Sequence, residues 1–171
     1  ARIATGRAGN VIGGGDFARD RLITDIMAAI RMSEPVRIRN PEAIRPWQHV
    51  LEPLHGYLML AEALAQSGEA FACGWNFGPT DEDVRPVRWI CDELAERWGQ
   101  GASWVTDGGN HPHEATYLKL DSSRARNLLG WRPKLRLHEA LDWIVSWNKT
   151  MDDQGDIRAR TLQEIETYES L

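Results

Sequence analysis

The sequence predicts an α/β fold that is rich in helices and has several short strands. Two observations carry this prediction. Apolar residues recur at intervals of three and four in long segments, and short apolar or alternating runs lie between turn residues. The predicted helices are 21–31, 52–66, 86–98, a short one that ends at Leu129, 137–147 and a polar one in the tail after Gln154.

The helix boundaries rest on residues that start or stop helices. Pro86 stands where a first helical turn favours proline. Gly68, Gly99 and Gly130 follow helical segments at positions typical of a C-terminal stop. The tail helix carries few apolar residues, so we expect it to be weakly anchored and mobile.

The predicted strands are all short: 1–6, 36–39, 75–77, 104–105 and 117–120. Short strands need neighbours to be stable, and these pieces do not close a sheet well among so many helices. The chain also begins without a methionine, in a strand that leads directly into a glycine-rich turn. We therefore expect the neighbouring strands to lie in sequence outside this chain.

Composition and charge narrow the classes of partner. Of the 171 residues, 42% are apolar and 26% are charged, and the formal net charge is -5. An acidic chain is a poor general binder of the nucleic-acid backbone, and no apolar run reaches the roughly 20 residues that a membrane span needs. Cys73 and Cys91 form no CxxC pair, which favours a reducing compartment such as the cytoplasm. We thus expect neither nucleic-acid nor membrane partners.

A glycine-rich segment, GNVIGGGD at residues 9–16, follows the first predicted strand. It is not the dinucleotide fingerprint, which needs G-x-G-x-x-G at the start of a helix. One interpretation is a flexible turn. The other is the edge of a binding cleft, where glycine lets the backbone approach a ligand and the Asn10 amide bonds a sugar hydroxyl or a phosphate oxygen.

Three arginines, Arg37, Arg39 and Arg45, lie close together near Trp47 in this acidic chain. They fit either a solvated, charged edge strand or a site for phosphate groups, whose oxygens match the guanidinium fork. Apolar residues flank Arg45 on both sides, and an arginine in such a place tends to be partly buried and to need an anionic partner. This context favours the anion-binding interpretation at Arg45.

The stretch 110–114 holds His111, His113 and Glu114. Its spacing differs from the metal-binding H-E-x-x-H pattern and it lacks an obvious fourth ligand, so polar lining of a cleft or loop structure is favoured over a metal site. No serine or cysteine stands in a pattern typical of nucleophilic catalysis. The residues alone therefore indicate binding features without a catalytic set.

Five segments follow one another in a familiar order: GRAGNVIGGGD, DRLITD, RIRNPEAIRPWQHVLEPLHGYLMLAEAL, WNFGP and HPHEATYLKLDSSRARNLLGWRPKLRLHEALDWIVSW. They resemble the C-terminal half of the extended short-chain dehydrogenases that act on nucleotide sugars, and the resemblance covers about residues 1–150. The pattern RNPxAIRPWQHVLEP is the most specific, and within this superfamily the chain most resembles the CDP-glucose 4,6-dehydratases. The LGWRP pattern is shared by many epimerases and dehydratases.

The resemblance implies the C-terminal substrate-binding portion of an enzyme with an NAD(P)-binding Rossmann domain. Residues 1–12 and 46–79 would be remnants of the Rossmann domain, 13–45 and 80–150 would form the substrate-binding domain, and 151–171 would be a tail helix. In such enzymes the glycine fingerprint and the Tyr-x-x-x-Lys pair belong to the N-terminal half. NAD would thus be bound mainly outside this chain, which alone would be inactive.

The implied reaction converts CDP-D-glucose to CDP-4-keto-6-deoxy-D-glucose by NAD-assisted dehydration. The resemblance also implies that the whole enzyme is a homo-oligomer with a small nucleotide sugar as its partner. Two alternatives stay open. One is another epimerase or dehydratase that takes a UDP- or GDP-sugar, and the other is a nucleotide- or sugar-binding module without catalysis.

The resemblance assigns binding roles to individual residues, none of them catalytic and none a metal ligand. The implied substrate-binding residues are Asn10 and Arg45 at the sugar diphosphate, Arg21 and Leu22 at the helix start that meets the nucleotide, Arg39 and Asn40 beside the base, and His111 and Glu114. Related epimerases have an arginine and an aspartate, which contact phosphate and ribose, where this chain has His111 and Glu114. The sequence departs from the family there, and also at Thr24, where proline is usual.

Overall fold

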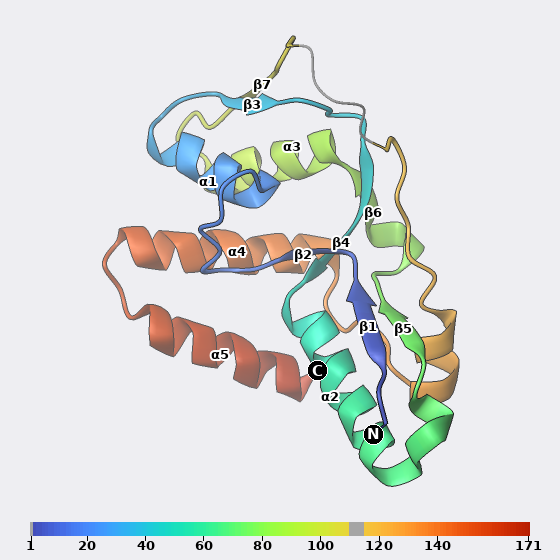
Figure 1. Cartoon of the computed structure of the whole chain (residues 1–171). Helices are drawn as coiled ribbons and strands as arrows, with labels where there is room; N and C mark the ends of the chain where they lie inside the picture. The colour runs from blue at the N-terminus through green and yellow to red at the C-terminus, as the bar shows by residue number, and fades with distance from the viewer. Residues whose placement is uncertain (1, 110–114) are drawn as a thin grey trace.

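The computed structural model describes residues 2–109 and 115–171, and its strands form small, mostly parallel sheets (Figure 1). The strands are β1 (Thr5–Ala8), β2 (Asn10–Ile12), β3 (Val36–Ile38), β4 (Ile44–His49), β5 (Gly74–Phe77), β6 (Val84–Pro86) and β7 (Trp104–Thr106). The parallel pairs are β1 with β5, β2 with β4 and β3 with β7, and β6 runs antiparallel to β4. The predicted α/β class is confirmed.

The predicted helices are all present. The long ones are α1 (Leu22–Arg31), α2 (Leu51–Ser67), α3 (Val87–Trp98), α4 (Leu137–Asp152) and α5 (Ile157–Ser170), and shorter turns cover η1 (Gly68–Phe71), η2 (Asp81–Asp83) and η3 (Ala125–Leu129). Gly68, Gly99 and Gly130 cap helices at φ angles of 63°, 74° and 70°, as their positions predict. In the part of the chain described, no helix is long and apolar enough to cross a membrane.

The strand β4 carries no alternating pattern that would have marked it in the sequence. All of its residues after Ile44 are buried, on both faces, so the usual alternation of inward apolar and outward polar residues is absent. Three of the buried residues are polar, namely Arg45, Gln48 and His49. The glycine-rich segment 9–16 is not only a turn, because it contains the short strand β2.

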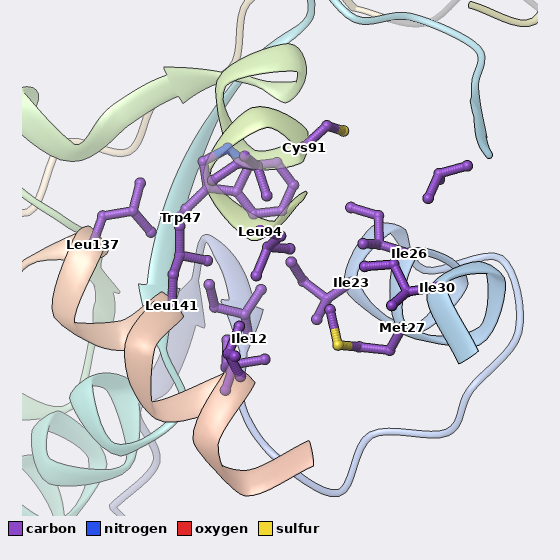
Figure 2. Close-up of a cluster of buried hydrophobic side chains, with 14 of the residues drawn as sticks. Ile12, Ile23, Ile26, Met27, Ile30, Trp47, Cys91, Leu94, Leu137 and Leu141 are labelled. Atoms are coloured by element: carbon purple, nitrogen blue, oxygen red, sulfur yellow. The ribbon is translucent and has the colours of Figure 1, made fainter. Parts of the chain in front are cut away.

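The larger hydrophobic core lies between the helices α1, α3 and α4 and the strands β2, β3 and β4 (Figure 2). It consists of Ile12, Ile23, Ile26, Met27, Ile30, Val36, Ile38, Trp47, Ile90, Cys91, Leu94, Leu137, Leu141, Ile144 and Val145. Trp47 of β4 belongs to this cluster together with Leu94 of α3 and Leu141 of α4, and Figure 2 shows all three in one group of side chains. This packing fixes β4, and with it the polar side chains that the strand carries.

A smaller core joins α2 to β5 and to η3. It consists of Leu60, Trp75, Phe77, Ala125 and Trp131. The Phe77 and Trp131 rings meet edge to face with their centroids 5.2 Å apart. The presence of two cores agrees with a two-part chain, but Ala125 and Trp131 pack with α2 although the predicted boundaries assign them to the other part. The division into domains stays a prediction.

The tail helix α5 is better anchored than its sequence suggests. It packs on α4, and its C-terminal end returns to α2 (Figure 1). Tyr168 is buried and its hydroxyl donates to Glu52 Oε2 at 2.9 Å. The expectation of few anchors is therefore wrong, because the contacts of α5 are made by a tyrosine and by polar side chains that apolar spacing does not reveal.

Candidate functional site

A cleft of about 600 Å³ opens between β2, β4, the end of β3 and the first turn of α1. Among its lining residues are six of the eight that the resemblance implies: Asn10, Arg21, Leu22, Arg39, Asn40 and Arg45. The fold thus brings together side chains that are up to 35 positions apart in the sequence. His111 and Glu114 lie outside the described residues. What the cleft binds, and the role of each residue in it, stays a prediction at this point.

The floor of the cleft is formed by β2 and β4. Their parallel register places Asn10 opposite Trp47, and both residues line the cleft. The Trp47 indole is buried and its Nε1 donates to the carbonyl of Arg85 at 3.1 Å. Because the indole is fixed by this bond and by the larger core, the floor beside Asn10 is rigid.

Arg45 brings a positive charge to this floor. Its side chain is only 7% exposed, and its Nη1 donates to the carbonyl of Ile44 at 2.9 Å. The prediction that Arg45 is partly buried is therefore confirmed. Guanidinium keeps its charge when buried, so such a group requires polar or anionic partners. A diphosphate in the cleft would be a partner of the required chemistry.

Carboxylates hold two of the other arginines at the mouth of the cleft. Arg21 Nη1 lies 3.0 Å from Asp16 Oδ2, and Arg39 Nη2 lies 3.3 Å from Asp20 Oδ1. Both arginine side chains are well exposed, so each ion pair contributes little to stability.

Two aspartates in the cleft have shifted pKa values. A hydrogen bond from the amide of Ala18 lowers the pKa of Asp16, and burial raises the pKa of Asp25 with Asp20 as a second cause. Sequence reasoning missed Asp20 and Asp25 as lining residues. The sequence did hold a sign of their position. Asp20 and Asp25 lie on either side of the predicted start of α1, next to Arg21, which the resemblance assigns to the site.

The first turn of α1 adds a further feature suited to anions. Arg21 precedes the helix without a side-chain capping bond, and Leu22 and Ile23 line the cleft. The first amides of an α-helix have no partner within the helix and carry the positive end of its dipole. The start of α1 thus has the geometry of an anion site, and its predicted contact with a nucleotide phosphate stays a prediction.

The three consecutive glycines that follow β2 pack against protein. A Cβ at Gly14 would lie 2.3 Å from Trp147 Cγ, and one at Gly13 would lie 2.9 Å from Val50 Cγ1. Gly15 has a φ of 77° and also faces the Trp147 ring. Gly14 is thus needed for close packing on an indole.

A buried histidine lies beneath the same loop. His49 is 3% exposed, its ring meets Trp143 edge to face at 5.4 Å, and its Nε2 has no hydrogen-bond partner among the described residues. Burial lowers the pKa of His49 from 6.5 to about 4. The imidazole is therefore neutral near pH 7. Over the same described ranges, no group of three or more His, Cys, Asp or Glu side chains is placed to hold a metal.

Comparison with solved structures defines the class of the fold. The chain superposes with a TM-score of 0.74 on UDP-glucuronic acid 4-epimerase from Bacillus cereus, at 18% identity over 88% of this chain and 46% of that one. It matches dTDP-glucose 4,6-dehydratase from Bacillus anthracis with a TM-score of 0.66, at 15% identity over 89% and 46%. The chain thus shares the fold of about half of each of these two enzymes, which is the fold that the resemblance to extended short-chain dehydrogenases implies.

Within that class the sequence is similar to one particular enzyme. The chain is 52% identical over 168 residues to a CDP-glucose 4,6-dehydratase from Salmonella typhimurium. The match covers 98% of this chain and 47% of the relative, of which it is a C-terminal part. The predicted resemblance is confirmed, and the chain spans less than half the length of that relative. No family model matches the chain.

Proposed function

We propose that this chain forms the nucleotide-sugar-binding part of a cytoplasmic CDP-glucose 4,6-dehydratase. The observation that carries the proposal is the 52% identity to the Salmonella typhimurium enzyme along 98% of the chain. The reaction would remove water from CDP-D-glucose and yield CDP-4-keto-6-deoxy-D-glucose, a precursor for deoxysugar synthesis. The cleft supports the proposal because its chemistry suits a sugar joined to a nucleoside diphosphate.

Different side chains of the cleft would bind the diphosphate, the sugar and the base of such a substrate. Arg45, on the rigid floor, would bind the diphosphate together with the first amides of α1. Asn10 would bond a hydroxyl of the sugar, and Arg39 with Asn40 would lie beside the cytosine base. Each of these groups donates hydrogen bonds and holds an anionic, hydroxylated ligand in one orientation. The roles are binding and orientation, and no catalytic residue is assigned to this chain.

NAD would be bound mainly by the N-terminal half of the enzyme, outside this chain. The glycines after β2 support this because they do not form the G-x-G-x-x-G pattern of a dinucleotide site, and Gly14 packs on Trp147. When bound by the remainder of the enzyme, NAD would supply the acceptor and donor of hydride. We also propose that residues 1–12 and 46–79 belong to the NAD-binding domain and that the whole enzyme is a homo-oligomer. The chain by itself would bind substrate weakly and turn over none.

The test is a chimera in which this chain replaces the matching segment of the Salmonella typhimurium enzyme. With NAD present, we expect the chimera to convert CDP-glucose to a 4-keto sugar, followed by NMR of the products. UDP-glucose and GDP-glucose serve as competing substrates. Preference for either of these would replace the proposed substrate by another nucleotide sugar. An inactive chimera, combined with tight ligand binding by the chain alone, would favour a binding module.

A further inference from the structure

The helices α4 and α5 do not contribute residues to the described lining of the cleft, yet α4 contacts the loop that follows β2, which connects residues of that lining. The chain between β2 and α1 runs along α4 in Figure 1. Gly14 of this loop lies so close to Trp147 of α4 that a Cβ would come within 2.3 Å of the indole. Phe17 covers the same ring, with centroids 6.4 Å apart. The indole is therefore the surface on which the loop rests.

The indole is in turn fixed by the C-terminal helix. Trp147 is 6% exposed, and its Nε1 donates to Thr161 Oγ1 of α5 at 2.9 Å. Thr161 Oγ1 donates to the carbonyl of Ile157 at 2.8 Å, so the hydroxyl both gives and receives a bond. This arrangement defines one orientation for the ring. Without the hydrogen bond to Thr161, the Trp147 ring would keep its apolar contacts but would no longer be held in one orientation by that bond.

The loop that rests on Trp147 has residues of the cleft lining on both sides of it in the sequence. Asn10 precedes it on β2, and Asp16, which pairs with Arg21 at 3.0 Å, follows it. A shift of the loop at Gly14 therefore moves the sugar-facing and the phosphate-facing sides of the cleft together. The position of α5 can therefore affect the shape of the cleft, because α5 bonds the Trp147 indole and the loop packs on that indole.

We propose that Trp147 is a positioning residue, and that α5 sets the geometry of the cleft through the Thr161–Trp147–Gly14 contact. The inference rests on the proposed function for its choice of ligand. It is independent of which residues perform the chemistry, because Trp147 touches the loop and not the substrate. It implies that weakening the contact changes the affinity for CDP-glucose while the rate at saturation stays the same.

The experiment compares Thr161→Val with Thr167→Val. Both threonines are exposed on α5 and each donates to the carbonyl four residues before it, but only Thr161 accepts from the indole. In the active chimera, we expect Thr161→Val to raise KM for CDP-glucose by roughly three- to tenfold, the range for one lost hydrogen bond, with kcat unchanged. Thr167→Val should leave both values unchanged. Gly14→Ala, which displaces the loop from the other side, should raise KM at least as much.

A second readout does not depend on substrate or on catalysis. In the full chain alone, hydrogen exchange of the amides of residues 13–21 should be faster in Thr161→Val than in Thr167→Val. Equal exchange in the two variants, or equal KM in an active chimera, would overturn the positioning role. An unsubstituted chimera that is inactive on CDP-glucose would instead count against the proposed function, and the exchange comparison would still decide the link.

Discussion

Tyr168 of α5 donates a hydrogen bond to Glu52 of α2 at 2.9 Å, across 116 positions of the sequence. Glu52 is 1% exposed, and its other carboxylate oxygen accepts from the amides of Lys134 and Leu135 at 2.9 Å and 2.7 Å. Burial raises the pKa of Glu52 despite these bonds. The carboxyl group of Glu52 on α2 thus forms hydrogen bonds with α5 and with the segment 134–135.

Replacing the tyrosine tests how much this junction contributes to stability. Tyr168→Phe keeps the ring against Glu52 but leaves one buried carboxylate oxygen without its donor, which costs about 1–3 kcal/mol of unfolding free energy. Urea denaturation of the full chain, followed by circular dichroism, measures the change. Tyr117→Phe, at an exposed position, is the control and should have little effect. Equal stability of the two variants would show that the bond contributes nothing.

Close packing of α2 on β5 gives a second prediction. A Cβ at Gly56 would lie 2.3 Å from Phe77 Cδ1, in a core where the Phe77 and Trp131 rings also meet edge to face. Gly56→Ala should therefore lower the unfolding free energy by about 1–3 kcal/mol, as overpacking does. Gly108→Ala is the control, because a Cβ there meets no atom of the described residues within 4 Å. A thermal melt in which both variants match the unsubstituted chain would contradict the close approach.

Features that depend on residues close together in the sequence were predicted well. Amphipathic spacing is one of them, so the bounds of α1 were predicted to within one residue. The apolar residues on either side of Arg45 likewise indicated its burial. The contact of Gly14 with Trp147 joins distant segments, and nothing at either position marks it. The same holds for Tyr168, whose partner on α2 became visible only in the fold. A ligand-binding edge was one of the two interpretations of these glycines, because close approach to an indole and to a phosphate both require a missing Cβ.

Arg45 is the residue on which we expect substrate affinity to depend most. In the chimera, Arg45→Ala should weaken binding of CDP-glucose by about 2–3 kcal/mol, the scale of a lost charge-assisted hydrogen bond. Isothermal titration calorimetry measures the change in Kd. Arg85→Ala is the matched control, since Arg85 pairs with Arg45 in the register of β4 and β6 but is exposed and does not line the described cleft. Unchanged affinity in Arg45→Ala would remove the residue from the proposed site.

The buried histidine predicts how stability depends on pH. Since burial lowers the pKa of His49 from 6.5 to about 4, the unfolded chain takes up a proton at this residue before the native state does. Stability is therefore fully present above pH 6.5 and is lost as pH falls toward 4, by roughly 3 kcal/mol from this group. Denaturant titrations across this window should show the loss in the unsubstituted chain and a smaller one in His49→Gln. Other titrating groups affect both proteins alike, so a difference between the two that is constant with pH would mean that His49 is not held neutral.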